Sequence, residues 1–132
     1  MEKHKASCSC GQLALVYDGE IERISICHCY ACQKRTGSVF GVQTRLDKNK
    51  IRISGQATKY DRPTDEGDHV HFYFCPTCGA TVYGEIDDLP ETVSVAIGTS
   101  DNRNLPNPVF SVYEEQMVAW VVLPESVTEH MD

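Results

Sequence analysis

The stretch Cys27-His28-Cys29-Tyr30-Ala31-Cys32 carries three cysteines within six residues. Two further cysteine pairs flank it, in Cys8-Ser9-Cys10-Gly11 and in Cys75-Pro76-Thr77-Cys78-Gly79. Each group has the spacing of zinc ligands, because thiolates two or three residues apart can point at one metal ion. The sequence therefore predicts a fold organised around bound metal.

The two outer pairs can together complete one metal site. In Cys75-Pro76-Thr77-Cys78-Gly79, proline and glycine shape a turn typical of a zinc knuckle, which supplies half of a tetrahedron. Cys8 and Cys10 are two residues apart, so in extended backbone both side chains leave the same face and can supply the other half. We predict a closed structural zinc site made of Cys8, Cys10, Cys75 and Cys78.

The central group forms a separate site on this interpretation. Adding its three cysteines to either pair would give five thiolates, one more than tetrahedral zinc accepts. Cys27 and Cys29 can face one way at a strand end, and Cys32, one turn into a helix, can turn back to meet them. Three protein ligands and an open fourth position are typical of catalytic zinc. The alternatives are a fourth ligand other than cysteine, a redox pair of Cys29 and Cys32, and thiols that bind no metal.

Composition narrows the class of protein. The chain has 132 residues, 41% of them hydrophobic, and a formal net charge of −7. These values predict one globular domain over residues 1–132 and argue against nucleic acid as a partner. The longest apolar runs, such as Val118–Leu123, are far too short to span a membrane, and the first residues lack the apolar segment of a secretory signal. We therefore expect a cytoplasmic protein, in which closely spaced cysteines bind metal more often than they form disulfides.

The remaining sequence indicates an all-β fold. Short runs rich in β-branched and aromatic residues alternate with Gly, Asn, Asp and Pro, as in domains of many short strands. The expected strands are Gln12–Tyr17, Arg23–Cys27, Val39–Thr44, Ile51–Ile53, Thr58–Asp61, His69–Cys75, Ala80–Glu85, Thr92–Ile97, Val109–Tyr113 and Met117–Leu123. One short helix is expected over Tyr30–Thr36, ending at Gly37.

The three cysteine groups, in this order, resemble the glutathione-dependent formaldehyde-activating enzyme family, which includes centromere protein V. The resemblance rests on Cys8–Gly11, Cys27–Ser38 and Phe74–Ala80, and more loosely on a C-terminal segment carrying Trp120. It implies a β-tent domain of twisted antiparallel sheets. It also implies one zinc on Cys8, Cys10, Cys75 and Cys78 and a second on Cys27, Cys29 and Cys32.

The resemblance further implies an activity. It is a carbon–sulfur lyase reaction read in reverse, in which glutathione and formaldehyde condense to S-hydroxymethylglutathione. Cys27, Cys29 and Cys32 would then hold the catalytic zinc, and the partner would be a small thiol or thiol–aldehyde adduct, with glutathione as co-substrate. Two other hypotheses stay open: a non-enzymatic zinc module that binds a protein partner, and a thiol redox switch at Cys29 and Cys32.

A few more residues bear on function. Lys34 and Arg35, beside the central cysteines, are the candidate cations for an anionic glutathione, although either one alone is more often a solvated helix residue. Ser111 stands where many relatives carry a histidine. His28 should point away from the metal that its neighbours bind.

The other polar and aromatic features are expected to be structural. His69 and His71 share one strand face and are predicted to be ordinary polar strand residues. The acidic stretch Asp61–Asp68 is expected to be a solvated loop. Tyr113 and Trp120 are expected in the core.

Overall fold

The computed structural model describes residues 3–132 and divides the chain into two compact units. Unit 1 contains Arg45–Asn104 together with the N-terminal residues up to Glu20, and unit 2 contains Ile21–Thr44 and Leu105–Asp132. The chain passes between the units within strand β4 (Gly41–Asp47). Each group of cysteines lies entirely inside one unit.

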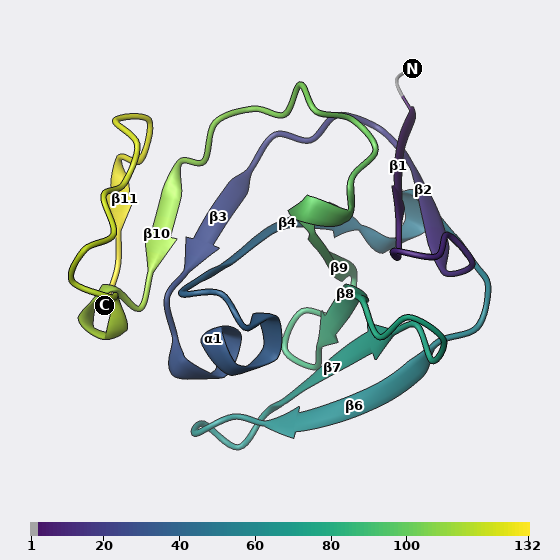
Figure 1. Cartoon of the computed structure of the whole chain (residues 1–132), viewed down its shortest axis with the longest axis horizontal. Coiled ribbons are helices and arrows are strands. Elements are labelled where there is room, and N and C mark those ends of the chain that lie inside the picture. Colours follow the sequence, from purple (N-terminus) through teal and green to yellow (C-terminus); the bar gives the residue numbers. More distant parts are fainter. Residues whose placement is uncertain (1–2) are drawn as a thin grey trace. The chain divides into compact units, whose positions relative to one another are not determined.

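Unit 1 is built from antiparallel strands (Figure 1). Strands β1, β2 and β5 pair in the order β1-β2-β5, and β6 to β9 follow one another as a meander. A short 3₁₀ helix, η1, precedes β5, and another, η2, follows β9. The bounds are β1 (Lys3–Ser7), β2 (Ala14–Asp18), η1 (Lys48–Lys50), β5 (Ile51–Ser54), β6 (Thr58–Pro63), β7 (His69–Phe74), β8 (Thr81–Ile86), β9 (Thr92–Ala96) and η2 (Ile97–Thr99).

Unit 2 combines three short strands, the first residues of β4 and an α-helix (Figure 1). Strand β3 (Ile24–Cys27) pairs antiparallel with β4 and parallel with β10 (Phe110–Val112), which also pairs with β11 (Glu129–His130). Helix α1 (Tyr30–Thr36) follows β3, and the 3₁₀ helix η3 (Glu114–Gln116) follows β10. The central cysteines therefore lie at the end of a strand flanked by β4 and β10.

Alternating side chains form the core of each unit. Leu15 in β2 is 2% exposed and Val93 in β9 is 1% exposed, while their sequence neighbours are more open. In unit 2, Ile24 and Ile26 of β3 are buried in the same way. This period of two is the pattern of sheets with one face against a core, and it explains why most strands could be predicted.

Sequence and structure agree for most elements. The all-β fold is confirmed, and the helix Tyr30–Thr36 has the predicted bounds. Nine of the predicted strands are present with ends shifted by up to a few residues, whereas β1 and β11 were not predicted. Both missed strands are rich in charged or polar residues, which hides the apolar alternation.

The prediction of a strand over Met117–Leu123 is wrong. This apolar run forms turns and irregular chain after η3. The predicted core positions of Trp120 and Tyr113 are also wrong, because their exposed fractions are 72% and 41%. Val122 in the same run is 89% exposed. The run is hydrophobic throughout, so its composition could not reveal that no sheet partner accepts it.

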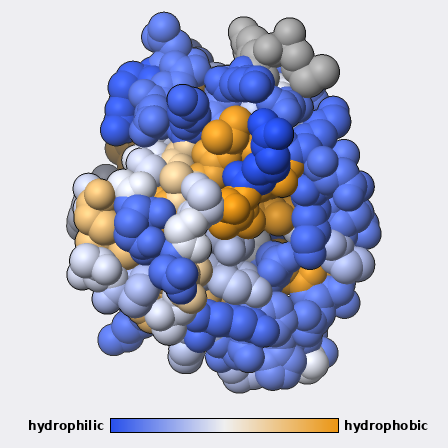
Figure 2. Space-filling view, turned by 90° about the vertical axis from the view of Figure 1, so that its right-hand side faces the viewer, coloured by the Kyte–Doolittle hydropathy of each residue, from blue (hydrophilic) through white to orange (hydrophobic). Residues whose placement is uncertain are grey.

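Most residues on the face drawn in Figure 2 are hydrophilic, and hydrophobic residues gather near its middle. This distribution fits a chain in which 23% of the residues are charged. Within residues 3–132, no helix has the length and apolar composition needed to cross a membrane.

Candidate metal centres

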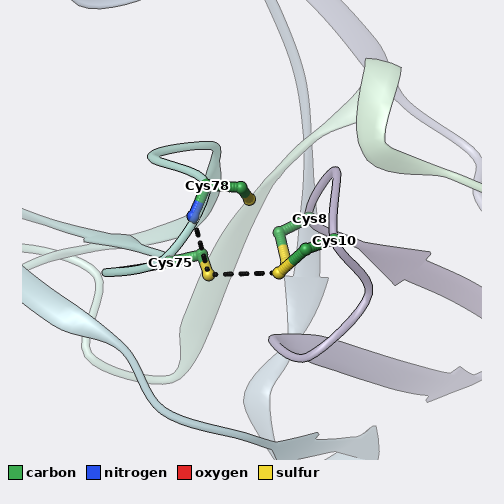
Figure 3. Close-up of side chains that lie close together, drawn as sticks. All are labelled: Cys8, Cys10, Cys75 and Cys78. Carbon is green, nitrogen blue, oxygen red and sulfur yellow. Dashed lines mark hydrogen bonds between the residues drawn. The ribbon is translucent and has the colours of Figure 1, made fainter.

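Four sulfurs converge in unit 1. The loop carrying Cys8 and Cys10 faces the loop carrying Cys75 and Cys78 (Figure 3). Sγ of Cys10 lies 3.6 Å from Sγ of Cys8 and 3.7 Å from Sγ of Cys75, and all four sulfurs lie within 4.8 Å of one another. The four cysteines expected to form one site thus lie together.

The reason given for the first pair is wrong. Cys8 and Cys10 do not sit in extended backbone; they lie in a turn closed by hydrogen bonds from Gly11 N to Cys8 O and from Cys8 N to Leu13 O. Gly11 has a φ of 86°, which glycine adopts without strain. A second turn, closed by Gly79 N to Cys75 O, carries the other pair. The site is therefore made of two knuckles.

The donor set fits a zinc ion. With zinc–sulfur bonds of ~2.3 Å, the edge of a tetrahedron of thiolates is about 3.8 Å. The sulfur separations of 3.6 and 3.7 Å match that edge. Four cysteines without a carboxylate or histidine are the ligands of structural zinc, so this site is suited to holding the fold together.

Cys75 is prepared to bind metal as a thiolate. Its burial opposes ionisation, but hydrogen bonds from the Gln12 amide and from the backbone of Cys78 and Thr77 outweigh this effect and lower the pKa of Cys75 to about 5. Cys10 behaves differently. The backbone of Gln12 favours its thiolate, but burial and the neighbouring thiols raise its pKa to about 11. Without a cation, the cluster cannot carry four negative charges.

Gln12 is held in place by the backbone of Gln56, in the connection between β5 and β6. Its Nε2 donates to Sγ of Cys75 at 2.9 Å and to the carbonyl of Gln56 at 2.7 Å, and its Oε1 accepts from the N–H of Gln56 at 2.8 Å. Gly55, with a φ of 94°, allows this approach: a Cβ there would lie 1.9 Å from the Gln12 carbonyl oxygen. Sequence reasoning missed Gln12, although it directly follows the first knuckle.

Three further sulfurs meet in unit 2. Sγ atoms of Cys27, Cys29 and Cys32 lie within 4.8 Å of one another. Cys27 ends β3, whereas Cys29 is the N-cap of α1 and its Sγ accepts a hydrogen bond from Cys32 N at 3.2 Å. Gly37, with a φ of 73°, ends the helix as predicted. In residues 3–132, this group and the four-cysteine group are the ones whose ligand atoms could hold a metal.

The three thiols suppress one another's ionisation. The thiols of Cys29 and Cys32, together with burial, raise the pKa of Cys27. Cys27 favours the thiolate of Cys32, but Cys29 and burial outweigh this effect and raise the pKa of Cys32 as well. A divalent cation would remove this repulsion, so the donor set fits zinc with three protein ligands.

His28 is not among the ligands. As expected, it does not join the sulfurs, but it is fully buried, with Nε2 2.9 Å from Oγ of Ser111. Ser111 also hydrogen-bonds Glu114 and lowers the pKa of that carboxyl. Because the hydroxyl donates to the carboxylate, Nε2–H of His28 donates to the hydroxyl. Burial lowers the pKa of His28, which keeps the imidazole neutral.

The chain after β10 supports the cysteine loop. Nε2 of Gln33 donates to the carbonyl of His28 at 2.9 Å and to that of Gln116 at 3.2 Å. Oε1 of Gln116 accepts from Tyr30 N at 2.7 Å, at the first residue of α1. Hydrogen bonds of Gln33 and Gln116 therefore hold the loop that carries these cysteines, and no single sequence motif predicts them.

The two predicted cations differ in their surroundings. Lys34 is exposed, whereas Arg35 is half-buried and its Nη2 lies 3.9 Å from Sγ of Cys32. Both lie in the last turn of α1, where positive charge favours the helix.

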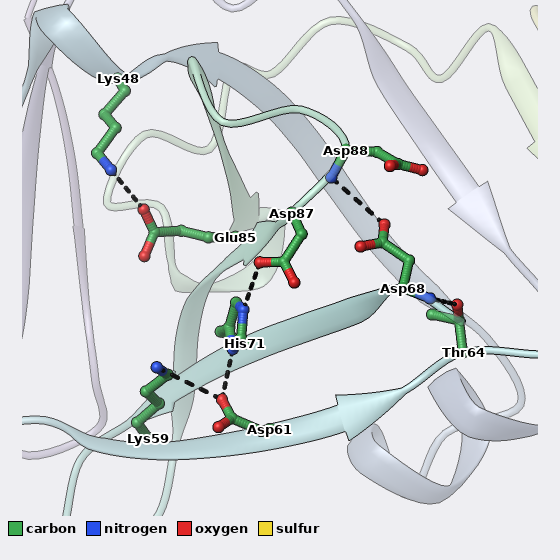
Figure 4. Close-up of polar contacts among 9 residues, drawn as sticks. All are labelled: Lys48, Lys59, Asp61, Thr64, Asp68, His71, Glu85, Asp87 and Asp88. Carbon is green, nitrogen blue, oxygen red and sulfur yellow. Dashed lines mark hydrogen bonds and ion pairs between the residues drawn. The ribbon is translucent and has the colours of Figure 1, made fainter. Parts of the chain in front are cut away.

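Unit 1 also contains a polar cluster away from the cysteines. His71 lies between Asp61 and Asp87: Nδ1 contacts Asp61, and Nε2 is 2.7 Å from Oδ1 of Asp87 (Figure 4). Hydrogen bonds to Asp61 and Asp87 raise the pKa of His71, and the bond from His71 lowers the pKa of Asp61. His69 stacks on the ring of His71 at 6.3 Å, so the shared face is confirmed.

The predictions for this cluster were partly wrong. His71 is more than an ordinary strand residue, since it connects β6 with the residue after β8. Asp61 belongs to β6 rather than to a solvated loop, and only the residues after Pro63 form a turn. The cluster does not converge on a point, because the two carboxylates bind opposite ring nitrogens.

Comparisons with known proteins agree with this geometry. The sequence profile described as "Glutathione-dependent formaldehyde-activating enzyme" matches residues 3–116. A Penicillium rubens protein named for the same activity is 21% identical over an alignment of 130 residues, which covers 96% of this chain and 68% of that protein. A crystal structure of a Rhodobacter sphaeroides protein has a similar fold, with a TM-score of 0.61 and 21% identity over 76% of this chain and 90% of that one.

The profile covers both cysteine groups and the strands that carry them. The resemblance drawn from the cysteine spacing is therefore confirmed. The chain belongs to the glutathione-dependent formaldehyde-activating enzyme family.

Proposed function

We propose that this protein is a zinc-dependent carbon–sulfur lyase-type enzyme that condenses glutathione with formaldehyde to give S-hydroxymethylglutathione. One observation carries the proposal: three thiols converge in unit 2 without a fourth ligand among the described residues, in a chain that holds a separate four-thiol cluster. A closed site serves structure, and a site with a coordination position to spare serves chemistry.

Cys27, Cys29 and Cys32 are proposed to hold the catalytic zinc. Bound there, zinc would supply positive charge that favours a substrate thiolate and polarises an aldehyde oxygen. In the reaction, the glutathione sulfur bonds to the aldehyde carbon, the carbonyl electron pair moves to oxygen, and that oxygen takes up the proton which the thiol lost. The neutral, buried His28 and its partner Ser111 keep the cysteine loop in position without competing for the metal.

Glutathione is a net anion, and the acidic chain must meet it with local positive charge. Lys34 and Arg35 are the proposed cations, since both lie on α1 directly after the last cysteine. A cytoplasmic location is part of the proposal, because the cysteine sites require reduced thiols.

The activity is tested by exchange spectroscopy of the glutathione–formaldehyde equilibrium. The wild-type protein should accelerate exchange between free formaldehyde and the adduct, and the Cys29→Ser variant should not. Ser38→Ala changes an exposed residue just after the helix and serves as the control. Equal exchange rates with wild-type and Cys29→Ser protein would refute the named reaction. A reversible Cys29–Cys32 disulfide under mild oxidation, without exchange activity, would favour the redox switch.

A second candidate function has its own observation. Trp120 and Val122 are 72% and 89% exposed, and such apolar side chains are common at contacts with other proteins. A non-enzymatic zinc module would use this segment to bind a protein partner. In that case Trp120→Ser would abolish the cellular role of the protein while Cys29→Ser would leave it unchanged.

A further inference from the structure

Gly41 stands opposite Cys27. It is the first residue of β4, and the antiparallel register with β3 pairs it directly with Cys27. Side chains at paired positions project from the same face of a sheet, about 5 Å apart. A side chain at position 41 would therefore project from the same face as that of Cys27, and the glycine places none there.

The distances around Gly41 show what this space borders. A Cβ built on Gly41 would lie 3.5 Å from Cβ and 3.7 Å from Sγ of Cys32, and 3.1 Å from Nη2 of Arg35. The first two are ordinary contacts, but the third is too close for the guanidinium to stay where it is. Gly41 is buried and its φ is not positive, so its backbone does not demand glycine. What matters instead is the absence of a side chain, because a glycine inside a strand often marks a place where a ligand approaches the backbone closely.

Arg35 brings positive charge to the same space. Its Nη2 lies 3.9 Å from Sγ of Cys32, close to the position that a side chain at residue 41 would take. Three thiolates around a divalent ion leave a net charge of −1; any thiol that binds as a thiolate makes it −2, and one that also carries a carboxylate makes it −3. A guanidinium at this distance offsets part of that repulsion.

We propose that Gly41 and Arg35 together select the fourth ligand of the three-cysteine site: Gly41 leaves room for it, and Arg35 favours an anionic thiol over a neutral one. The inference rests on the metal occupancy that the proposed function assigns to Cys27, Cys29 and Cys32. A thiol that takes this position gives its proton to solvent and binds as a thiolate. Arg35 is then a specificity-determining residue.

The experiment uses the full chain loaded with Co²⁺, whose absorption reports each new sulfur ligand. Mercaptoacetate, an anionic thiol, and 2-mercaptoethanol, a neutral one, are titrated separately, and the ratio of their dissociation constants is compared between variants. Arg35→Gln should lower the preference for mercaptoacetate by about 5- to 10-fold relative to wild type. Arg23→Gln, which precedes β3 and lies at the end of that strand opposite Cys27, should leave the ratio within about twofold. Comparing ratios removes the intrinsic difference between the two thiols.

Gly41 is tested by filling the space. Gly41→Val should weaken both thiols by about tenfold or more, and Gly41→Ala should give a smaller loss, because the guanidinium can move by a few tenths of an ångström. Gly98→Ala is the control, since a Cβ there meets nothing within 4 Å. The cobalt spectrum without added thiol shows that each variant retains its metal sites.

Each result is decisive. An unchanged thiol ratio in Arg35→Gln, or wild-type thiol affinity in Gly41→Val, overturns the inference even if the enzyme condenses glutathione with formaldehyde. Thiol binding with the expected ratios but without exchange activity overturns the proposed reaction and supports the inference. A chain that binds one Co²⁺ rather than two overturns both.

Discussion

The side-chain amide of Gln12 donates a hydrogen bond across 2.9 Å to Sγ of Cys75. The amide has no freedom to leave, because its other contacts go to the backbone of Gln56. A donor fixed in this way stabilises negative charge on the sulfur, which is the form that binds a metal. The relationship links the chemistry of the four-cysteine site to residues outside both knuckles.

Gln12→Leu should weaken the four-cysteine site. Loss of the hydrogen bond makes the Cys75 thiolate easier to protonate, so zinc should transfer to a competing chelator about 10- to 100-fold faster. Transfer is followed with a chromophoric chelator at neutral pH. Gln56→Leu is the matched control, because Gln56 bonds Gln12 through its backbone. Equal rates for the two variants would show that the amide has no influence on the metal.

Removal of metal should affect the two sites unequally. Cys78→Ser breaks a site that joins distant parts of unit 1, so it should lower the melting temperature strongly and reduce the zinc content to about one per chain. Cys29→Ser changes a site formed within six residues, and the loss of melting temperature should be much smaller. Calorimetry with metal analysis gives both quantities. A larger loss for Cys29→Ser would reverse the assignment of structural and open sites.

The cluster of Asp61, His71 and Asp87 should make stability depend on pH. The folded pKa of His71 is raised above 6.5, so its contribution is complete below about pH 6.5 and is lost as pH rises through the raised value. The pKa of Asp61 is lowered below 3.8, so its contribution is present above about pH 3.8 and is lost as pH falls through the lowered value. The cluster therefore contributes most between these limits.

His71→Gln should consequently destabilise the protein more at pH 6 than at pH 9. Urea unfolding at the two values measures the difference, with zinc present throughout. His69→Gln, on the neighbouring stacked ring, is the control. A cost of substitution that is the same at both pH values would mean that the ion pairs do not contribute.

Ser111→Ala should destabilise unit 2. It removes the partner of the buried His28 Nε2–H, and an unpaired buried donor costs about 1–3 kcal/mol. Urea unfolding gives this value, and Ser38→Ala, at an exposed position, should cost far less. Ser111→Thr keeps the hydroxyl and tests whether the bond rather than the volume matters, since an equal cost for Ala and Thr would point to packing.

The features that were predictable from sequence are the local ones. The bounds of α1 follow from Cys29 as N-cap and Gly37 as the left-handed stop, both of which act within a few residues. Cysteine spacing predicted the three-cysteine cluster for the same reason, whereas the four-cysteine cluster followed from the number of ligands that tetrahedral zinc accepts. Most strands showed the alternation that burial of one face produces.

The features that escaped prediction depend on contacts between distant segments. Gln12 meets Gln56 across 44 residues, and His28 meets Ser111 across 83. Gly41 is one glycine within a predicted strand, and its position next to the cysteine site becomes visible only from the register that pairs it with Cys27. The prediction for Trp120 was wrong because a hydrophobic side chain favours burial but is buried only where other segments pack against it.

The two cysteine sites also differ in when they can exist. The three-cysteine site has all of its cysteines as soon as residue 32 has been synthesised. The other site needs Cys10 to meet Cys75, 65 residues later, and cannot close until Cys78 has left the ribosome. Until then the growing chain carries Cys8 and Cys10 as half of a site, and the segment Ile21–Thr44, which belongs to the other unit, is made before the second half. Metal supply during translation, and not only afterwards, therefore bears on how this protein is assembled.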